Sequence, residues 1–304
     1  MSSISNSVEQ LTQAHLRNVQ QLAVFYTGHE NVYAINIAKI KAFIITEEVD
    51  ISDTPTEYDV VMGIATIRGE PITLINLDIW LGQEPLDIKD YKLIIFCEFN
   101  NHQMGFLVKD VINIIEKTTD ELNKNDEKNP KITYTTYVDV KNKPKLCTVF
   151  NAEQLLVDIG WMDDGESQLE KHVDKPVDNS KKILVAEDSK VAREVLIAFM
   201  KKIQANYEIF ENGTDLLTRL SHIDPNSVGL ILTDIEMPDT DGYQVAKFIK
   251  DSSNLSHIPI VVNSSMTTKA VKDKMQSIGV DDFVGKSDLK GLYKAVLEYI
   301  GEKR

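Results

Sequence analysis

Residues 228–242 read VGLILTDIEMPDTDG, and this stretch decides the fold of the second half of the chain. Its apolar start, 228–232, predicts a buried strand of the kind found in parallel sheets. Asp234 follows this strand after a single threonine. Pro238 and Gly242 are turn-forming residues, so we expect the chain to turn here before the helical spacing that follows.

The alternation of strand and helix extends from residue 181 to residue 304. Apolar residues at helical spacing follow each predicted strand. Five such units predict one parallel sheet with helices on both faces, whose ligands gather at the carboxyl ends of the strands. The other four strands are predicted by apolar runs at 183–186, 207–210, 260–262 and 282–284.

Polar side chains follow four of these five strands. Glu187 and Asp188 follow the first strand, Asp234 the third, Ser264 the fourth and Lys286 the fifth. Alone, a Glu-Asp pair is often a helix cap, a serine often belongs to a loop, and a lysine often lies at the surface. Because the strand ends meet at one edge of the sheet, their joint placement favours a shared site.

Converging carboxylates of this kind raise one another's pKa unless a cation neutralises them. Mg²⁺ takes oxygen ligands and keeps several waters. With Mg²⁺ held there, Asp234 is predicted to be the nucleophile that accepts a phosphoryl group. Lys286 is predicted to neutralise one phosphoryl oxygen, and Ser264 to hydrogen-bond another. A calcium loop with Gly242 at its sixth position is excluded, because it needs an oxygen ligand at Met237.

Residues 181–304 resemble a response-regulator receiver domain over its full length. The resemblance implies a (βα)5 flavodoxin-like fold in which Asp234 is the phosphoacceptor and Glu187 and Asp188 are metal-site carboxylates. It is carried by four motifs, namely VAEDS at 185–189, LTDIEMPDTDG at 232–242, VNSS at 262–265 and FVGK at 283–286.

The receiver resemblance implies four further roles. Glu236 supplies a backbone carbonyl as a metal ligand, and Ser264 is the switch hydroxyl. Lys286 is the phosphate partner, and Phe283 is the switch aromatic.

Three residues depart from the receiver pattern. Ser287 follows Lys286 where the family usually has proline, and a cis bond there costs ~3 kcal/mol more than before proline. This favours a trans bond and leaves the placement of Lys286 open. Phe283 stands where many members carry tyrosine and has no hydroxyl. Ser265 replaces a smaller residue and bears on the access of an attacking water, so the phosphoryl lifetime also stays open.

The first half of the chain has a different periodicity. Short apolar runs alternate with polar turns between residues 20 and 156. Such strand–turn–strand units predict antiparallel hairpins arranged in barrels or a sandwich. Short helices are expected at 37–42 and 152–159. Residues 163–180 are polar with little apolar periodicity, which predicts a linker.

The first half shows no catalytic set. His15, His29 and His102 lie in a polar tail or in turns, without Cys or Glu partners at metal-ligand spacing, so they are expected to be solvated. Cys97 and Cys147 lie inside apolar runs and are expected to be reduced thiols in the core. These residues leave the first half as an interaction module.

Arg68 lies at the tip of a predicted hairpin, where Gly69 permits a tight turn. An exposed arginine on a rigid hairpin suits ion pairing at a protein interface, although an isolated one is more often solvated. Residues 18–160 resemble the CheW family through this turn, YAINI at 33–37 and GFLVKDV at 105–111. The resemblance implies two small five-stranded, SH3-like β-barrels and Arg68 as an interface residue.

Composition excludes several classes of function. The formal net charge of −14 argues against binding a nucleic-acid backbone or an anionic membrane surface. No apolar run approaches the ~20 residues of a membrane helix, and the polar N-terminus lacks the features of a signal peptide. No basic helix–turn–helix accompanies the receiver in this sequence, which argues against a DNA-binding regulator.

The predicted order is an N-terminal tail at 1–17, a CheW-like domain at 18–162, a linker at 163–180 and a receiver at 181–304. This arrangement resembles that of chemotaxis coupling proteins of the CheV family. The resemblance implies a cytoplasmic scaffold, associated with receptor arrays at the inner membrane, that couples methyl-accepting chemoreceptors to the histidine kinase CheA.

The same resemblance implies that phosphorylation of Asp234 modulates signalling output, which gives adaptation. No enzymatic activity is expected beyond self-catalysed phosphoryl transfer and autodephosphorylation. An alternative function is a phosphate sink, in which the receiver drains phosphoryl groups from the kinase and the CheW-like domain only localises it.

Overall fold

The computed structural model contains two units, Val19–Trp161 and a second unit whose described residues begin at Val173. The predicted tail at 1–17 lies outside the described residues, as does most of the predicted linker. Among the described helices, none is long and apolar enough to cross a membrane. The structure describes residues 19–54, 56–118, 121–124, 129–161, 173, 175–237 and 239–302.

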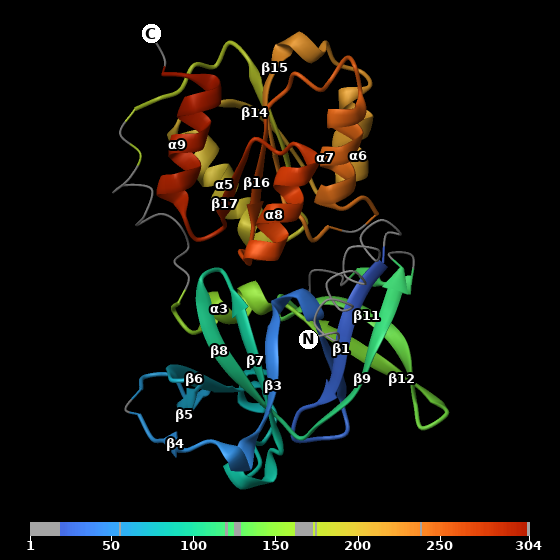
Figure 1. Ribbon diagram of the computed structural model, residues 1–304, viewed down its shortest axis with the longest axis vertical. Coiled ribbons are helices and arrows are strands. Elements are labelled where there is room, and N and C mark those ends of the chain that lie inside the picture. The colour runs from blue at the N-terminus through green and yellow to red at the C-terminus, as the bar shows by residue number, and fades with distance from the viewer. Residues whose placement is uncertain are drawn as a thin grey trace. The chain divides into compact units, whose positions relative to one another are not determined.

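The first described sheet of the first unit has six strands in the order β10-β11-β12-β2-β1-β9 (Figure 1). All neighbours are antiparallel except β12 and β2, which run parallel. Its strands are β1 (Val19–Tyr26), β2 (Val32–Asn36), β9 (Asp110–Thr118), β10 (Asn123–Lys124), β11 (Ile132–Val140) and β12 (Lys143–Phe150).

The second sheet of this unit has the order β3-β7-β8-β6-β5-β4, with β6 and β8 parallel. The CheW resemblance implies five strands in each barrel. Each described sheet has five long strands, and a two-residue strand, β10 or β4, brings the number to six. The strands are β3 (Ile40–Ile45), β4 (Ile51–Ser52), β5 (Val61–Ile67), β6 (Glu70–Asn76), β7 (Leu93–Phe99) and β8 (His102–Val108).

The predicted hairpins are confirmed. Strands β5–β6, β7–β8 and β11–β12 are each joined by two residues, both with positive φ. This conformation is that of a type I′ turn, whose twist matches that of the flanking strands. The turn residues are Arg68 and Gly69, Asn100 and Asn101, and Lys141 and Asn142.

One of the two helices predicted in the first half is wrong. The helix expected at 37–42 is a single 3₁₀ turn, η1 (Ile37–Lys39), and β3 begins at Ile40. The reason is the period of two in β3, where alternate side chains are partly buried and the others are exposed. The helix expected at 152–159 is confirmed as α3 (Ala152–Asp158), and a four-residue helix, α2 (Leu77–Trp80), was not predicted.

The cysteine prediction is confirmed, because Cys97 and Cys147 are free and buried. Burial raises the pKa of both thiols, that of Cys147 to about 12. The histidine prediction needs correction at His102, which is half-buried and lies 5.5 Å from the Trp161 ring. Burial lowers the pKa of His102. The Nε2 atom of His29 lies 2.7 Å from the Glu84 carbonyl oxygen.

The second unit contains one parallel sheet in the order β14-β13-β15-β16-β17, as predicted. Its core packs α5 and α9 on one face of the sheet, and α6, α7 and α8 lie on the other face (Figure 1). The strands are β13 (Lys182–Ala186), β14 (Asn206–Phe210), β15 (Val228–Thr233), β16 (Ile260–Ser264) and β17 (Asp282–Gly285). The helices are α5 (Lys190–Lys202), α6 (Gly213–Leu220), α7 (Gly242–Asp251), α8 (Lys269–Ile278) and α9 (Leu289–Ile300).

Part of the range predicted as a linker packs on the second unit. Val177 is fully buried in its core, and the Val177 amide donates to the Ile203 carbonyl at 2.9 Å. The hydroxyl of Tyr293, on α9, accepts from the Lys175 amide and donates to the Lys175 carbonyl, both at 3.0 Å. The chain therefore contacts the receiver core before β13 begins.

Candidate functional site

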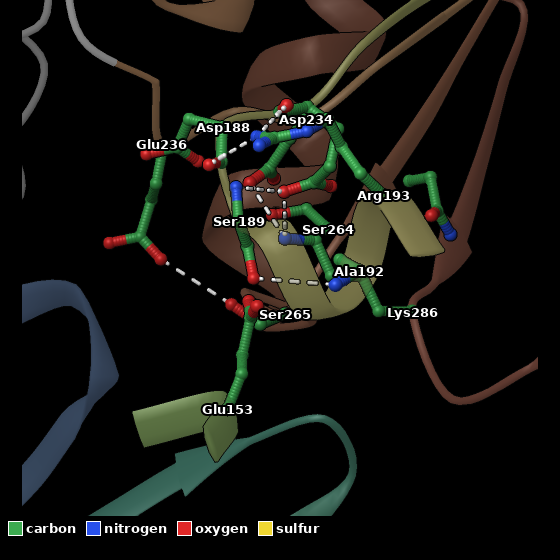
Figure 2. Close-up of polar contacts among 12 residues, drawn as sticks. Glu153, Asp188, Ser189, Ala192, Arg193, Asp234, Glu236, Ser264, Ser265 and Lys286 are labelled. Carbon is green, nitrogen blue, oxygen red and sulfur yellow. Dashed lines mark hydrogen bonds and ion pairs between the residues drawn. The ribbon is translucent and has the colours of Figure 1, made fainter. Parts of the chain in front are cut away.

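The site is built by the carboxyl ends of two neighbouring strands. Glu187 and Asp188 follow β13, and Asp234 follows β15. These strands are paired so that Ala186 lies beside Thr233. The three carboxylates that follow these two residues therefore lie together at one edge of the sheet. One oxygen of each carboxylate lies within 4.8 Å of the others. Figure 2 labels two of the three residues, Asp188 and Asp234. The predicted convergence is thus present in the structure.

Lys286 reaches this cluster from the end of β17. Its Nζ lies 2.9 Å from Glu187 Oε1 and 2.9 Å from Asp234 Oδ2. The three side chains are 1–4% exposed, so solvent screens these ion pairs little. Among the described residues every peptide bond is trans, including the bond between Lys286 and Ser287. Lys286 therefore contacts the carboxylates without the proline that usually follows this lysine in receivers.

The backbone holds Asp234 firmly. Asp234 Oδ1 accepts from the Ile235 amide at 2.6 Å, while Oδ2 accepts from Lys286. The Asp234 amide donates to the Ala186 carbonyl at 2.9 Å, which ties β15 to the loop that carries Glu187. Asp234 is 3% exposed. Both of its oxygens are therefore oriented by strong donors.

Two serines lie at the carboxyl end of β16. Ser264 is the last residue of the strand, and Ser265 follows it. Ser264 is fully buried, and its hydroxyl accepts from the Met266 amide at 3.3 Å. The Ser264 carbonyl accepts from the Lys286 amide at 3.2 Å, which links β16 to the lysine loop. The Ser265 hydroxyl donates to Glu236 Oε2 at 3.4 Å (Figure 2).

Two aromatic side chains of the second unit carry lysines over their rings. Phe283, on β17, is half-buried, and Lys272 Nζ lies 5.4 Å from its ring centroid. Tyr243, on α7, has Lys274 Nζ at 4.2 Å. Burial raises the pKa of Tyr243, with Asp241 and Glu236 adding to the rise, and burial lowers the pKa of Lys274.

Each of the two units is similar to a known protein family. Residues 21–160 match the CheW-like domain, and residues 183–297 match the response regulator receiver domain. The chain is 29% identical over 310 residues to chemotaxis protein CheV2 of Helicobacter pylori. The aligned region covers 94% of this chain and 96% of that protein. Chemotaxis protein CheV1 of the same organism is 28% identical over 320 residues, covering 96% of this chain and 97% of that protein.

The chain combines a CheW-like domain with a response regulator receiver domain, and over nearly its whole length it is similar to CheV proteins. Its two domains occur in the predicted order, and together they make it a chemotaxis signal-transduction coupling protein. Chemotaxis protein CheV3 of Helicobacter pylori is also similar, with 26% identity over 279 residues, 86% of each chain.

The oxygen cluster of the receiver domain fits a hard divalent cation. Three carboxylates from two strand ends are close enough for one small ion to contact all of them, and oxygen is the ligand that such ions prefer. Lys286 already neutralises part of this charge, which explains how the carboxylates stay together in the structure.

Arg68 of the CheW-like domain lies in the two-residue turn between β5 and β6. It is exposed and has a φ of +54°, and Gly69 beside it has a φ of +86°. A left-handed pair at a type I′ turn is rigid, so the arginine is presented on a fixed support. The predicted tip position of Arg68 is confirmed, whereas its role as an interface residue stays a prediction.

Proposed function

We propose that this chain couples chemoreceptors to the histidine kinase CheA and that phosphorylation of Asp234 adjusts the kinase output. The observation that carries this proposal is the pairing of Lys286 with both Glu187 and Asp234 at the carboxylate cluster of the receiver domain. The CheW-like unit is proposed to hold the chain at receptor arrays on the inner face of the membrane.

The proposed acceptor step is a phosphoryl transfer between two side chains. A carboxylate oxygen of Asp234 forms the new P–O bond, while the P–N bond of the kinase phosphohistidine breaks and its imidazole leaves with the electron pair. Mg²⁺, when bound, neutralises the phosphoryl oxygens.

The chain's own residues have separate proposed roles in that step. Glu187, Asp188 and the Glu236 carbonyl hold the cation together with Asp234. The Lys286 ammonium pairs with a phosphoryl oxygen, and the Ser264 hydroxyl donates to another. Phe283 is the aromatic whose position is proposed to report the phosphorylated state. The signal is the phosphoryl group on Asp234, which carries up to two negative charges.

The test is a reconstituted assembly of receptor, kinase and this chain, with kinase output measured before and after phosphorylation. Wild-type chain is expected to change the output when phosphorylated, and Asp234→Asn is expected to leave it constant. No competing response regulator is added. If the two chains give equal output under these conditions, Asp234 serves only as a phosphate sink, and modulation of the kinase is contradicted.

Charge reversal at Arg68 tests the coupling surface separately. Arg68→Glu is expected to reduce capture of the kinase or receptor in a pulldown by about tenfold or more, because it places a repulsive charge at a rigid contact. Lys141→Glu is the matched control, since Lys141 is exposed in another two-residue turn with positive φ. Equal capture by wild type and Arg68→Glu would count against Arg68 as an interface residue.

A further inference from the structure

Arg193 contacts the back of the loop that carries two of the site carboxylates. It lies in the first turn of α5, and its side chain is 12% exposed. Its Nη1 donates to the Glu187 carbonyl at 3.1 Å and to the Asp188 carbonyl at 2.6 Å. Arg193 and Asp188 are labelled in Figure 2. Long side chains near a helix start point back toward its N-terminus, which is why Arg193 reaches this loop.

The remaining contact of the guanidinium is weaker. Its Nη2 lies 3.3 Å from Glu211 Oε1, but Glu211 is 53% exposed, and exposed ion pairs contribute little. The two carbonyl contacts, at 2.6 and 3.1 Å, are both shorter than the contact with Glu211, and they involve consecutive peptides. Both carbonyl contacts come from one nitrogen, Nη1, whose two hydrogens have fixed directions in the guanidinium plane, whereas an ammonium on a flexible stem is not held in this way.

The loop is short and fixed from several sides. The Glu187 amide donates to the Phe210 carbonyl at 3.0 Å, and Glu187 Oε1 accepts from the Ser189 amide at 3.0 Å. Ser189 then caps α5 by accepting from the Ala192 amide. The carbonyls of Glu187 and Asp188 precede α5 and therefore lie outside its backbone hydrogen bonds. The Arg193 side chain donates to both of them.

We propose that Arg193 is a positioning residue that holds Glu187 and Asp188 in the geometry required by Mg²⁺. The inference rests on the proposed function, because it assigns a residue that sets the metal preference of the same site. Groups that orient metal ligands from behind commonly cost about 10–100-fold in metal affinity when they are changed.

The choice between Mg²⁺ and Ca²⁺ separates geometry from charge. Mg²⁺ demands a near-octahedral arrangement, whereas Ca²⁺ accepts longer and more variable contacts. A loosened loop therefore weakens Mg²⁺ binding more than Ca²⁺ binding. Removing the arginine charge affects both divalent ions alike, and so does a fraction of unfolded protein. The ratio of the two affinities consequently reports only the geometry of the loop.

The experiment titrates the full chain with Mg²⁺ alone and with Ca²⁺ alone, using calorimetry. Arg193→Lys retains the charge and loses the planar guanidinium, and Arg193→Met loses both. Both variants are expected to lower Mg²⁺ affinity by about tenfold and to shift the affinity ratio toward Ca²⁺ by about threefold or more. Arg219→Lys is the matched control, because Arg219 makes two bonds to Glu208 in the same unit and is expected to leave the ratio unchanged.

The outcomes distinguish the two proposals. If wild type binds Mg²⁺ and both Arg193 variants keep the wild-type ratio, the positioning role is overturned while the proposed function stands. If the ratio shifts equally in Arg219→Lys, the effect is not specific to the loop, and the positioning role is also overturned. If wild type binds no Mg²⁺, the proposed function fails, and the role of Arg193 fails with it.

Discussion

The Lys286→Met variant is expected to lose about 3–5 kcal/mol of unfolding free energy in the second unit when divalent cations are absent. The physical reason is that Lys286 bridges Glu187 and Asp234, all of them almost fully buried. Removing the ammonium leaves two buried carboxylates facing each other without this partner. Added Mg²⁺ is expected to restore part of the loss, because it neutralises the same oxygens.

Amide hydrogen exchange of β15 and β17 peptides is the suitable measurement. Both tryptophans, Trp80 and Trp161, belong to the first unit, so their fluorescence does not report on the second. Lys294→Met is the control, since Lys294 is exposed on α9. Wild-type protection in Lys286→Met without Mg²⁺ would show that the ammonium does not stabilise the cluster.

Gly242→Ala is expected to lower both stability and phosphoryl acceptance. A Cβ atom at Gly242 would lie 2.1 Å from the Asp234 carbonyl oxygen and 2.9 Å from Ile235 Cα, so the backbone must move. Overpacking of this kind costs about 1–3 kcal/mol and sometimes more. Because the displaced atoms belong to Asp234 itself, we also expect the rate of phosphoryl labelling to fall by about tenfold or more.

Gly301→Ala is the control for Gly242→Ala in the same unit. A Cβ at Gly301 meets nothing within 4 Å, although its φ of +87° adds a backbone cost of about 1 kcal/mol. Labelling by Gly301→Ala is expected to equal that of wild type. If Gly242→Ala also labels at the wild-type rate, the close approach of α7 to Asp234 has no part in positioning the acceptor.

The alternation of strands and helices predicted a parallel sheet with helices on both faces and the convergence of Glu187, Asp188, Asp234 and Lys286, and the motifs added the resemblance to a receiver. This was possible because parallel topology places all carboxyl strand ends at one edge, whatever the loops do. Which side chains contact one another within the site was harder to predict. Whether Lys286 contacts the carboxylates depends on the conformation of its loop, and the unusual Ser287 left that open.

Other features depend on contacts that a pattern of residue types does not contain. Gly242 was interpreted as a turn former, but its close approach to Asp234 appears only once α7 is packed on β15. Arg193 was missed, although its place one turn after Ser189 offers a signal, since such a side chain points back to the preceding loop. The helix expected at 37–42 failed because β3 pairs with β7 from Ile40 onward.

Phosphoryl labelling of the full chain tests the central claim most directly. Wild type and Asp234→Asn are incubated with Mg²⁺ and a small acyl phosphate, and the label on each protein is followed over time. The account predicts a label on wild type that requires Mg²⁺ and no label on Asp234→Asn. Equal labelling of the two proteins would contradict the claim that this aspartate is the phosphoacceptor.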